Sequence, residues 1–237
     1  MRRVLVMVAV LGCSAPPPPA PVPQPPPVVR QIKSAPELPA PTAVAPYSVT
    51  ADAMIVLDGR SIAVTGAGPW DAIAHELARV PPELRGVLQT LAVSAEPSPN
   101  DAYFAQKYKL PVKAGMSTGL HGDITIYPYG LAELRGNADM FVKNLMHELG
   151  HAWSRIAWRS DPSARDAWLA AIASDRGVAS EYARTSFRSS GAPDEDAAEA
   201  TALFFLVRGT PRFEPYRQAM PRRFALIAKR FGLAIDR

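Results

Sequence analysis

The chain has 237 residues, of which 26 are Lys or Arg and 22 are Asp or Glu, so its formal net charge is +4. This weak positive charge, without a basic run interleaved with aromatic residues, gives no reason to expect a nucleic-acid partner. Cys13 is the only cysteine, so an intrachain disulfide is excluded and the fold must be stabilised by its core.

The first thirteen residues have the pattern of an export signal. Two arginines precede the apolar residues 4–11, which are far fewer than the ~20 residues needed to cross a bilayer. Residues 10–13 (VLGC) resemble the lipobox of bacterial lipoproteins, in which the cysteine is acylated and begins the mature chain. We therefore expect residues 1–13 to be a lipoprotein-type signal peptide and Cys13 to be the lipid anchor, the only attachment to the membrane. The expected location is the bacterial cell envelope, at the outer membrane or cell surface; the alternative is a plain signal peptide.

Residues 14–46 form a proline-rich tether. Prolines occur in runs at 16–19 and 25–27 and recur up to position 46, a composition that favours polyproline II and buries no core. At ~3.1 Å per residue, this segment could hold the following domain up to about 100 Å from its anchor. We expect one domain at 47–237, because ~190 residues are enough to form a core of their own.

The pattern of this domain predicts mixed strands and helices followed by helices only, which is typical of an α+β fold. Asp58-Gly59 between two apolar runs is a hairpin signal, and Pro128 ends an alternating run, which indicates an edge strand. Residues 87–93 fit either a strand or a helix. In chain order we expect strands at 54–57, 61–64 and 123–127, a loop at 111–121, and helices at 71–79, 137–158, 163–174, 194–208 and 221–231.

The strongest functional signal is His-Glu-x-x-His at 147–151, the zinc signature of metallopeptidases. His147 and His151 lie one turn apart on a helix and point the same way, so both can bind one zinc ion. Glu148, rotated by roughly 100° from His147, can reach a water at that ion. The apolar face of the helix lies on the opposite side and consists of Phe141, Leu145, Leu149, Ala152 and Ile156.

A third protein ligand is needed if the fourth position is left to water. His151 is the last histidine, so a downstream carboxylate must serve. Glu195 and Glu199 lie one turn apart on a helix face that Ala202 and Leu206 continue inward, and an inward carboxylate needs a partner. Acids at a helix N-terminus also complement the helix dipole, which accounts for Glu195 but not for Glu199. Either Glu195 binds zinc and Glu199 hydrogen-bonds a ligand histidine, or the two roles are exchanged.

Three segments together, 147–152 (HELGHA), 181–185 (EYART) and 195–199 (EDAAE), resemble the catalytic domain of anthrax lethal factor and its relatives, which include the secreted proline-proline endopeptidases. These enzymes are gluzincins, zinc peptidases whose third ligand is a glutamate. The resemblance covers about residues 118–208. It implies a zincin-like fold with a small mixed sheet, an active-site helix and a C-terminal helical part.

The resemblance also implies roles for individual residues. Glu195 would bind zinc, Glu199 would support the site, and Tyr182 would help to stabilise the oxyanion. The motif and the resemblance together predict a zinc-dependent endopeptidase with one Zn²⁺ per chain, acting on a peptide or protein substrate. We expect this substrate to lie extended along the strand at 123–127, as an added strand. Glu148 would be the general base on a water activated by the zinc.

The alternative is a membrane-anchored binding module that has kept a peptidase fold without turnover. Glu148 argues for the enzyme, because catalysis requires this residue and binding does not. A structural zinc site is disfavoured, since such sites are usually closed by four protein ligands.

Overall fold

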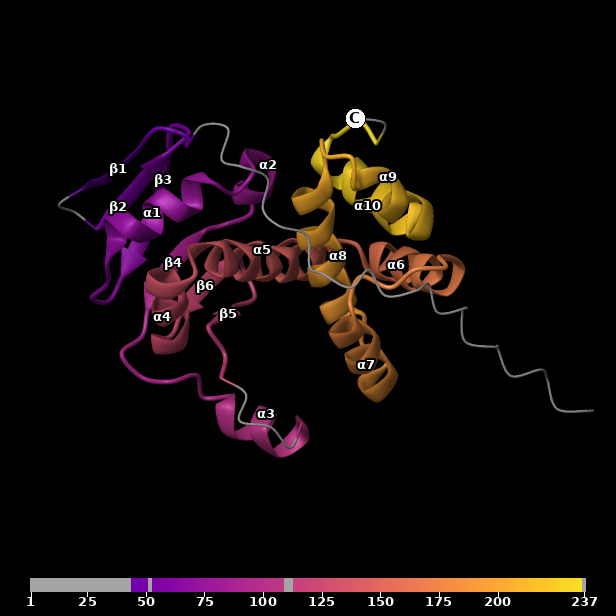
Figure 1. Ribbon diagram of the computed structural model, residues 1–237, viewed down its shortest axis with the longest axis horizontal. Coiled ribbons are helices and arrows are strands. Elements are labelled where there is room, and N and C mark those ends of the chain that lie inside the picture. The colour runs from indigo at the N-terminus through magenta and orange to yellow at the C-terminus, as the bar shows by residue number, and fades with distance from the viewer. Residues whose placement is uncertain (1–43, 51–52, 109–112, 236–237) are drawn as a thin grey trace, which may run out of the picture.

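The computed structural model describes residues 44–50, 53–108 and 113–235 (Figure 1). The expected signal peptide at 1–13, with Cys13, and almost all of the expected tether at 14–46 lie outside the described residues. No helix in the described part of the chain is long and apolar enough to cross a membrane. Helices and a mixed sheet make up the fold, which confirms the α+β class.

A six-stranded sheet lies on one side of the molecule and has the order β1-β2-β3-β4-β6-β5. The expected hairpin is confirmed, because β2 and β3 pair antiparallel around Asp58-Gly59. Both turn residues have the left-handed backbone conformation, which explains why a glycine stands at position 59. β3, β4 and β6 are parallel to one another, whereas β5 is antiparallel to β6. The strands are β1 (Tyr47–Thr50), β2 (Met54–Leu57), β3 (Arg60–Thr65), β4 (Thr90–Val93), β5 (Met116–Thr118) and β6 (Asp123–Ile126).

The prediction that residues 123–127 form an edge strand is wrong. β6 lies between β4 and β5, and Pro128 ends the strand by beginning the next helix. The edge strand on this side of the sheet is β5, which falls within the expected loop at 111–121. Its three residues are too few to show an alternating pattern, and the strand exists through its pairing with β6.

Ten helices are present in the described part of the chain, and they include all five that the sequence predicts. Five others, α2, α3, α4, α7 and α9, are not among the expected helices, and most are short or lack a clear apolar face. The helices are α1 (Trp70–Ala78), α2 (Pro82–Arg85), α3 (Asp101–Tyr108), α4 (Pro128–Gly136), α5 (Ala138–Ser160), α6 (Pro162–Ser174), α7 (Glu181–Ser190), α8 (Asp194–Val207), α9 (Phe213–Ala219) and α10 (Pro221–Phe231).

Helix α5 is the central element, with the sheet toward its N-terminal half and helices α6–α10 toward its C-terminal half (Figure 1). It begins where the Asn137 side chain accepts a hydrogen bond from the N–H of Met140, at 3.1 Å. It ends before Asp161, which caps α6, and Pro162 begins that next helix. Asn137 and Asp161 thus fix the length of the helix that carries the His-Glu-x-x-His motif.

Helix α8 crosses α5 at very short range. A Cβ atom on Gly150 would lie 2.7 Å from Ala198 Cα and 2.8 Å from its carbonyl oxygen, so only glycine fits at this crossing. Trp153 also donates a hydrogen bond to Thr201 Oγ1 at 2.6 Å. The sequence predicts one buried face for α5, but α8 covers the histidine side too, and His151 is only 5% exposed.

Candidate metal centre

Two histidines of α5 form one side of the candidate site. Their rings approach edge to face, with centroids 4.7 Å apart, as expected for side chains one helical turn apart. The His151 side chain is 6% exposed and that of His147 is 18% exposed. The pair is therefore largely removed from water but still reachable from solvent through His147.

Glu195, on the first turn of α8, meets both histidines. Its Oε2 atom lies 3.4 Å from Nε2 of His147 and 3.3 Å from Nε2 of His151. Ligand atoms of all three residues lie within 4.8 Å of one another. The structure therefore brings together the three residues that the sequence predicts as metal ligands, although Glu195 lies more than forty positions beyond His151 in the chain.

These distances suit a tetrahedral ion better than direct hydrogen bonds. Two ligand atoms at about 2.0–2.2 Å from a tetrahedral Zn²⁺ are about 3.4 Å apart, whereas N–H···O hydrogen bonds are usually shorter than about 3.2 Å. Within the described residues, Glu195 Oε2 is buried without a well-aligned hydrogen bond, which is costly unless another partner is present. Two imidazoles and a carboxylate are also a donor set that zinc takes.

Glu199 stands behind the first histidine. Its Oε1 atom lies 2.9 Å from Nδ1 of His147, although the ring N–H is not aligned with it as a hydrogen bond. Burial opposes the charge of Glu199, but His147, with a smaller contribution from Ser180 at the start of α7, holds the pKa of its carboxyl group below the usual value. The structure thus places Glu195 on the Nε2 side of His147 and Glu199 on the Nδ1 side.

The charges of this group are strongly coupled. Burial opposes the charged form of His147, but Glu195, Glu199 and the nearby Glu148 outweigh it and raise its pKa to about 10. Burial likewise opposes the charge of Glu195, yet the two histidines hold its pKa well below the usual range. Without a bound metal, the surrounding carboxylates therefore favour a proton on His147.

Glu148 is held from the sheet side. The hydroxyl of Thr118, on the edge strand β5, lies 2.5 Å from Glu148 Oε2 and 2.9 Å from its backbone oxygen. Arg155, two turns further along α5, donates to the carbonyl oxygen of Thr118. Glu148 is therefore fixed beside the histidines by a contact between α5 and the sheet edge.

Tyr182 lies on the first turn of α7, and its side chain is 42% exposed. It is two residues beyond Ser180, which reaches Glu199, so it lies at the end of α7 that is nearest to the cluster. Its role in stabilising an oxyanion stays a prediction from the resemblance.

Three residues that the sequence analysis does not single out contribute to the site: Thr118, Gly150 and Ser180. Gly150 could have been noticed as a glycine inside a helix, which normally costs stability and needs a reason. Ser180 precedes a glutamate-led helix as a capping serine does. Nothing in the sequence marks Thr118, because its contact with Glu148 depends on the pairing of β5.

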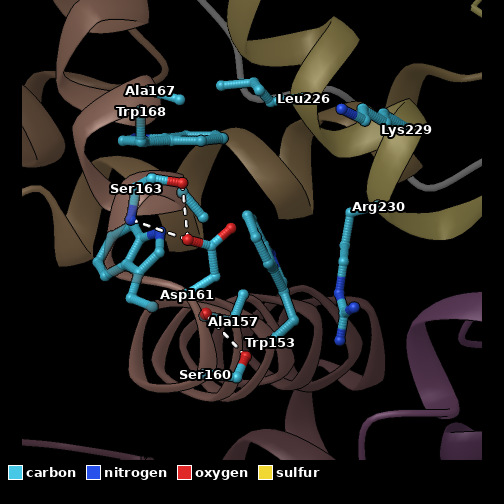
Figure 2. Close-up of a pocket in the computed structure, with 12 residues that line it drawn as sticks. Trp153, Ala157, Ser160, Asp161, Ser163, Ala167, Trp168, Leu226, Lys229 and Arg230 are labelled. Carbon is cyan, nitrogen blue, oxygen red and sulfur yellow. Dashed lines mark hydrogen bonds between the residues drawn. The ribbon is translucent and has the colours of Figure 1, made fainter.

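A cavity of about 420 Å³ lies elsewhere, between the C-terminal end of α5 and helices α6 and α10 (Figure 2). Trp153, Trp158 and Trp168 form its aromatic wall, and Asp161, Lys229 and Arg230 supply charged groups. None of the residues of the His-Glu cluster lines it, so the candidate metal centre is a convergence of side chains outside this cavity.

Comparison with protein-family models, with curated proteins and with solved structures finds no match for this chain. The resemblance to lethal factor and the zincin-like fold therefore stay predictions.

Proposed function

We propose that the protein is a zinc-dependent endopeptidase with a zincin-like catalytic domain. The observation that carries the proposal is the convergence of His147, His151 and Glu195 at distances suited to one tetrahedral ion, with Glu148 next to them. Among the described residues three such side chains converge, not four. An open fourth position is the usual mark of a catalytic rather than a structural zinc site.

His147, His151 and Glu195 would hold one Zn²⁺, and Glu199 would orient His147 from the other side of its ring. Zinc would supply a Lewis acid that polarises the scissile carbonyl and makes a water molecule more acidic. Glu148 is placed to accept a proton from the attacking water and to deliver it to the leaving amine. The Thr118 hydroxyl would hold the carboxylate of Glu148 in position for both transfers.

The substrate would be an extended peptide that pairs with β5 rather than with the strand at 123–127. β5 has a paired neighbour only on its β6 side among the described strands, and an unpaired edge can accept a further strand. β5 also packs beside α5. Because Thr118 belongs to β5 and touches Glu148, a peptide on this edge would lie next to the general base.

The test is to purify the full chain, measure bound metal, and incubate the protein with a library of unstructured peptides. We expect about one Zn²⁺ per chain and cleavage that a chelator stops. Glu148→Gln should retain the metal and cleave about 10²- to 10⁴-fold more slowly, since general acid–base catalysis contributes about that factor.

Glu214→Gln is the matched control. Glu214 lies on α9, is bonded to Arg217 and Gln218, and takes no part in the cluster, so this variant should cleave like the wild type. Cleavage by Glu148→Gln at the wild-type rate would refute the mechanism. One bound zinc without cleavage of any peptide would favour the binding module.

A further inference from the structure

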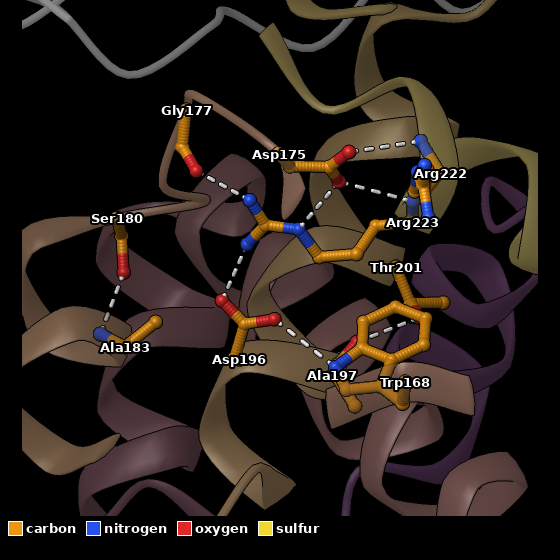
Figure 3. A network of polar contacts seen from close by, with 10 residues as sticks. All are labelled: Trp168, Asp175, Gly177, Ser180, Ala183, Asp196, Ala197, Thr201, Arg222 and Arg223. Atoms are coloured by element: carbon orange, nitrogen blue, oxygen red, sulfur yellow. Dashed lines mark hydrogen bonds and ion pairs between the residues drawn. The ribbon is translucent and has the colours of Figure 1, made fainter. Parts of the chain in front are cut away.

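We propose that Arg223 and Asp196 position the third metal ligand, Glu195, through a buried ion-pair cluster with Asp175. This inference rests on the metal site of the proposed function and adds residues that do not touch the ion. Asp196 follows Glu195 directly on α8, whereas Asp175 and Arg223 come from the end of α6 and from α10 (Figure 3).

Each of the three nitrogens of the Arg223 guanidinium donates a hydrogen bond inside the protein. Its Nε donates to Asp175 Oδ2 at 3.0 Å, one terminal nitrogen donates to Asp196 Oδ2 at 2.6 Å, and the other donates to the carbonyl oxygen of Gly177. The side chain of Arg223 is 1% exposed. Such a planar group with several fixed partners determines their relative positions, which a single hydrogen bond would not do.

Both oxygens of Asp196 are also fixed. Oδ2 accepts from Arg223, and Oδ1 accepts from the indole N–H of Trp168 at 3.0 Å. Asp196 is 4% exposed, so its carboxylate has little freedom to take another rotamer. It is thus held by α10 on one side and by α6 on the other.

This anchoring matters because α8 begins without a side-chain cap. In a helix, successive side chains are about 100° apart around the axis. Fixing Asp196 therefore sets the rotation of the first turn, and with it the direction in which Glu195 points. On the other side, the Gly150–Ala198 crossing fixes the distance between α8 and α5. Together these contacts determine both the rotation and the approach of the glutamate.

Asp175 completes the cluster from outside α8. Its two oxygens accept the backbone N–H groups of Arg222 and Arg223 at 3.0 and 3.1 Å, so it caps the start of α10. Replacing a buried ion pair by apolar residues is often neutral or stabilising. The position of the cluster, one residue from a proposed ligand, therefore points to orientation rather than to stability alone.

Asp175 and Asp196 offer a matched pair of variants. Each aspartate loses one charge facing Arg223 when it is changed to asparagine, but only Asp196 belongs to α8. In the full chain, the affinity for Zn²⁺ is measured by competition with a chromophoric chelator, and the geometry of the site by the visible absorption of bound Co²⁺. We expect Asp196→Asn to lower the affinity at least fivefold and to change the Co²⁺ spectrum. Asp175→Asn should lower the melting temperature about as much as Asp196→Asn does. It should nevertheless keep the Zn²⁺ affinity within twofold of the wild type and leave the Co²⁺ spectrum unchanged.

Trp168→Phe serves if Asp196→Asn does not fold, because it keeps every charge and removes the indole N–H that Asp196 accepts, together with part of a buried ring. It should lower Zn²⁺ affinity at least twofold and shift the Co²⁺ spectrum in the same direction. If Asp196→Asn folds and keeps the wild-type Zn²⁺ affinity and Co²⁺ spectrum, the positioning role is overturned while the metal site stands. If Asp196→Asn does not fold, the same result in Trp168→Phe overturns it. A wild-type chain that binds no Zn²⁺ or Co²⁺ would overturn the proposed function and this inference together.

Discussion

The two regions on either side of α5 contribute to the candidate site in different ways. The helical region, α6–α10, supplies Glu195 and Glu199, the two carboxylates that meet the histidines from outside α5. The sheet region supplies a neutral hydroxyl, that of Thr118, which touches Glu148. In the proposed enzyme, the helical region would supply the carboxylate ligand of the ion, whereas the sheet region would hold the base and the substrate edge. Changes in the two regions should therefore affect different measurements.

The largest effect is expected within the helical region, where two glutamates one turn apart can be compared. Glu195→Gln should lower Zn²⁺ affinity by more than about 100-fold, whereas Glu199→Gln should lower it by about 10- to 100-fold, the usual effect of losing an outer partner. Competition titrations measure both affinities. The reverse order would exchange the roles of the two residues.

The next largest effect is expected where the two regions meet, at the crossing of α5 and α8. Gly150→Ala introduces a methyl group 2.7 Å from Ala198 Cα, so the helices must separate, at a cost of about 1–3 kcal/mol. Denaturant unfolding and Zn²⁺ titration should show losses in stability and in affinity together. Gly136→Ala, where a Cβ meets no atom within 4 Å, is the control and should change neither. Unchanged affinity in Gly150→Ala would mean that the crossing does not set the position of Glu195.

A smaller and more selective effect is expected in the sheet region. Thr118→Val keeps the shape of the side chain but removes the hydroxyl beside Glu148. It should slow cleavage several-fold and alter the pH–rate profile of kcat/KM, because the base loses its hydrogen-bond donor, while Zn²⁺ affinity stays within about twofold. Thr118→Ser retains the donor and should behave like the wild type. Equal losses in both variants would point to packing of β5 instead.

The smallest effect concerns pH. The pKa of His147 in the folded, metal-free protein is raised from 6.5 to about 10, so the folded state keeps a proton that the unfolded chain releases. The contribution of this proton to the free energy of unfolding is fully present below about pH 6.5 and is lost as the pH rises toward 10. Each kcal/mol lost lowers the melting temperature by about 2–4 °C in a domain of this size.

Between pH 6 and 9.5, the melting temperature should therefore fall more steeply with rising pH for the chelator-treated protein than for the zinc-loaded protein. In the zinc-loaded protein the imidazoles are neutral ligands. His147→Gln should remove the difference between the two. Parallel curves for the wild type would contradict the assignment of this alkaline loss to the cluster.

Much of the fold follows from local patterns. The turn at Asp58-Gly59 and the helix around residues 147–151 carry strong short-range signals, and both were predictable. β5 was not, because three residues cannot display a period and their strand depends on β6. The error about the edge strand followed directly, since β6 is internal only once β5 is known.

The candidate site likewise has a part that could be predicted from the sequence and a part that could not. The meeting of His147 and His151 with either Glu195 or Glu199 could be proposed from residue types and helical spacing, because few side chains can bind zinc; the choice of Glu195 came from the resemblance. The contact of Thr118 with Glu148 and the cluster around Arg223 could not, since both join elements distant in sequence and depend on how those elements pack. Spacing predicts which residues share one helix face, but not which neighbours a second or third helix brings.

The shortness of β5 limits what the proposed enzyme could recognise. In an antiparallel pair, successive residues turn their N–H and C=O groups to opposite sides, so at most about two of its three residues can offer them to a bound chain. A strand edge this short would form backbone hydrogen bonds with only a few consecutive residues of a substrate. Selectivity would then depend on side-chain fit near the cut, and accessible loops or unfolded tails would be better targets than strands already paired in a folded protein.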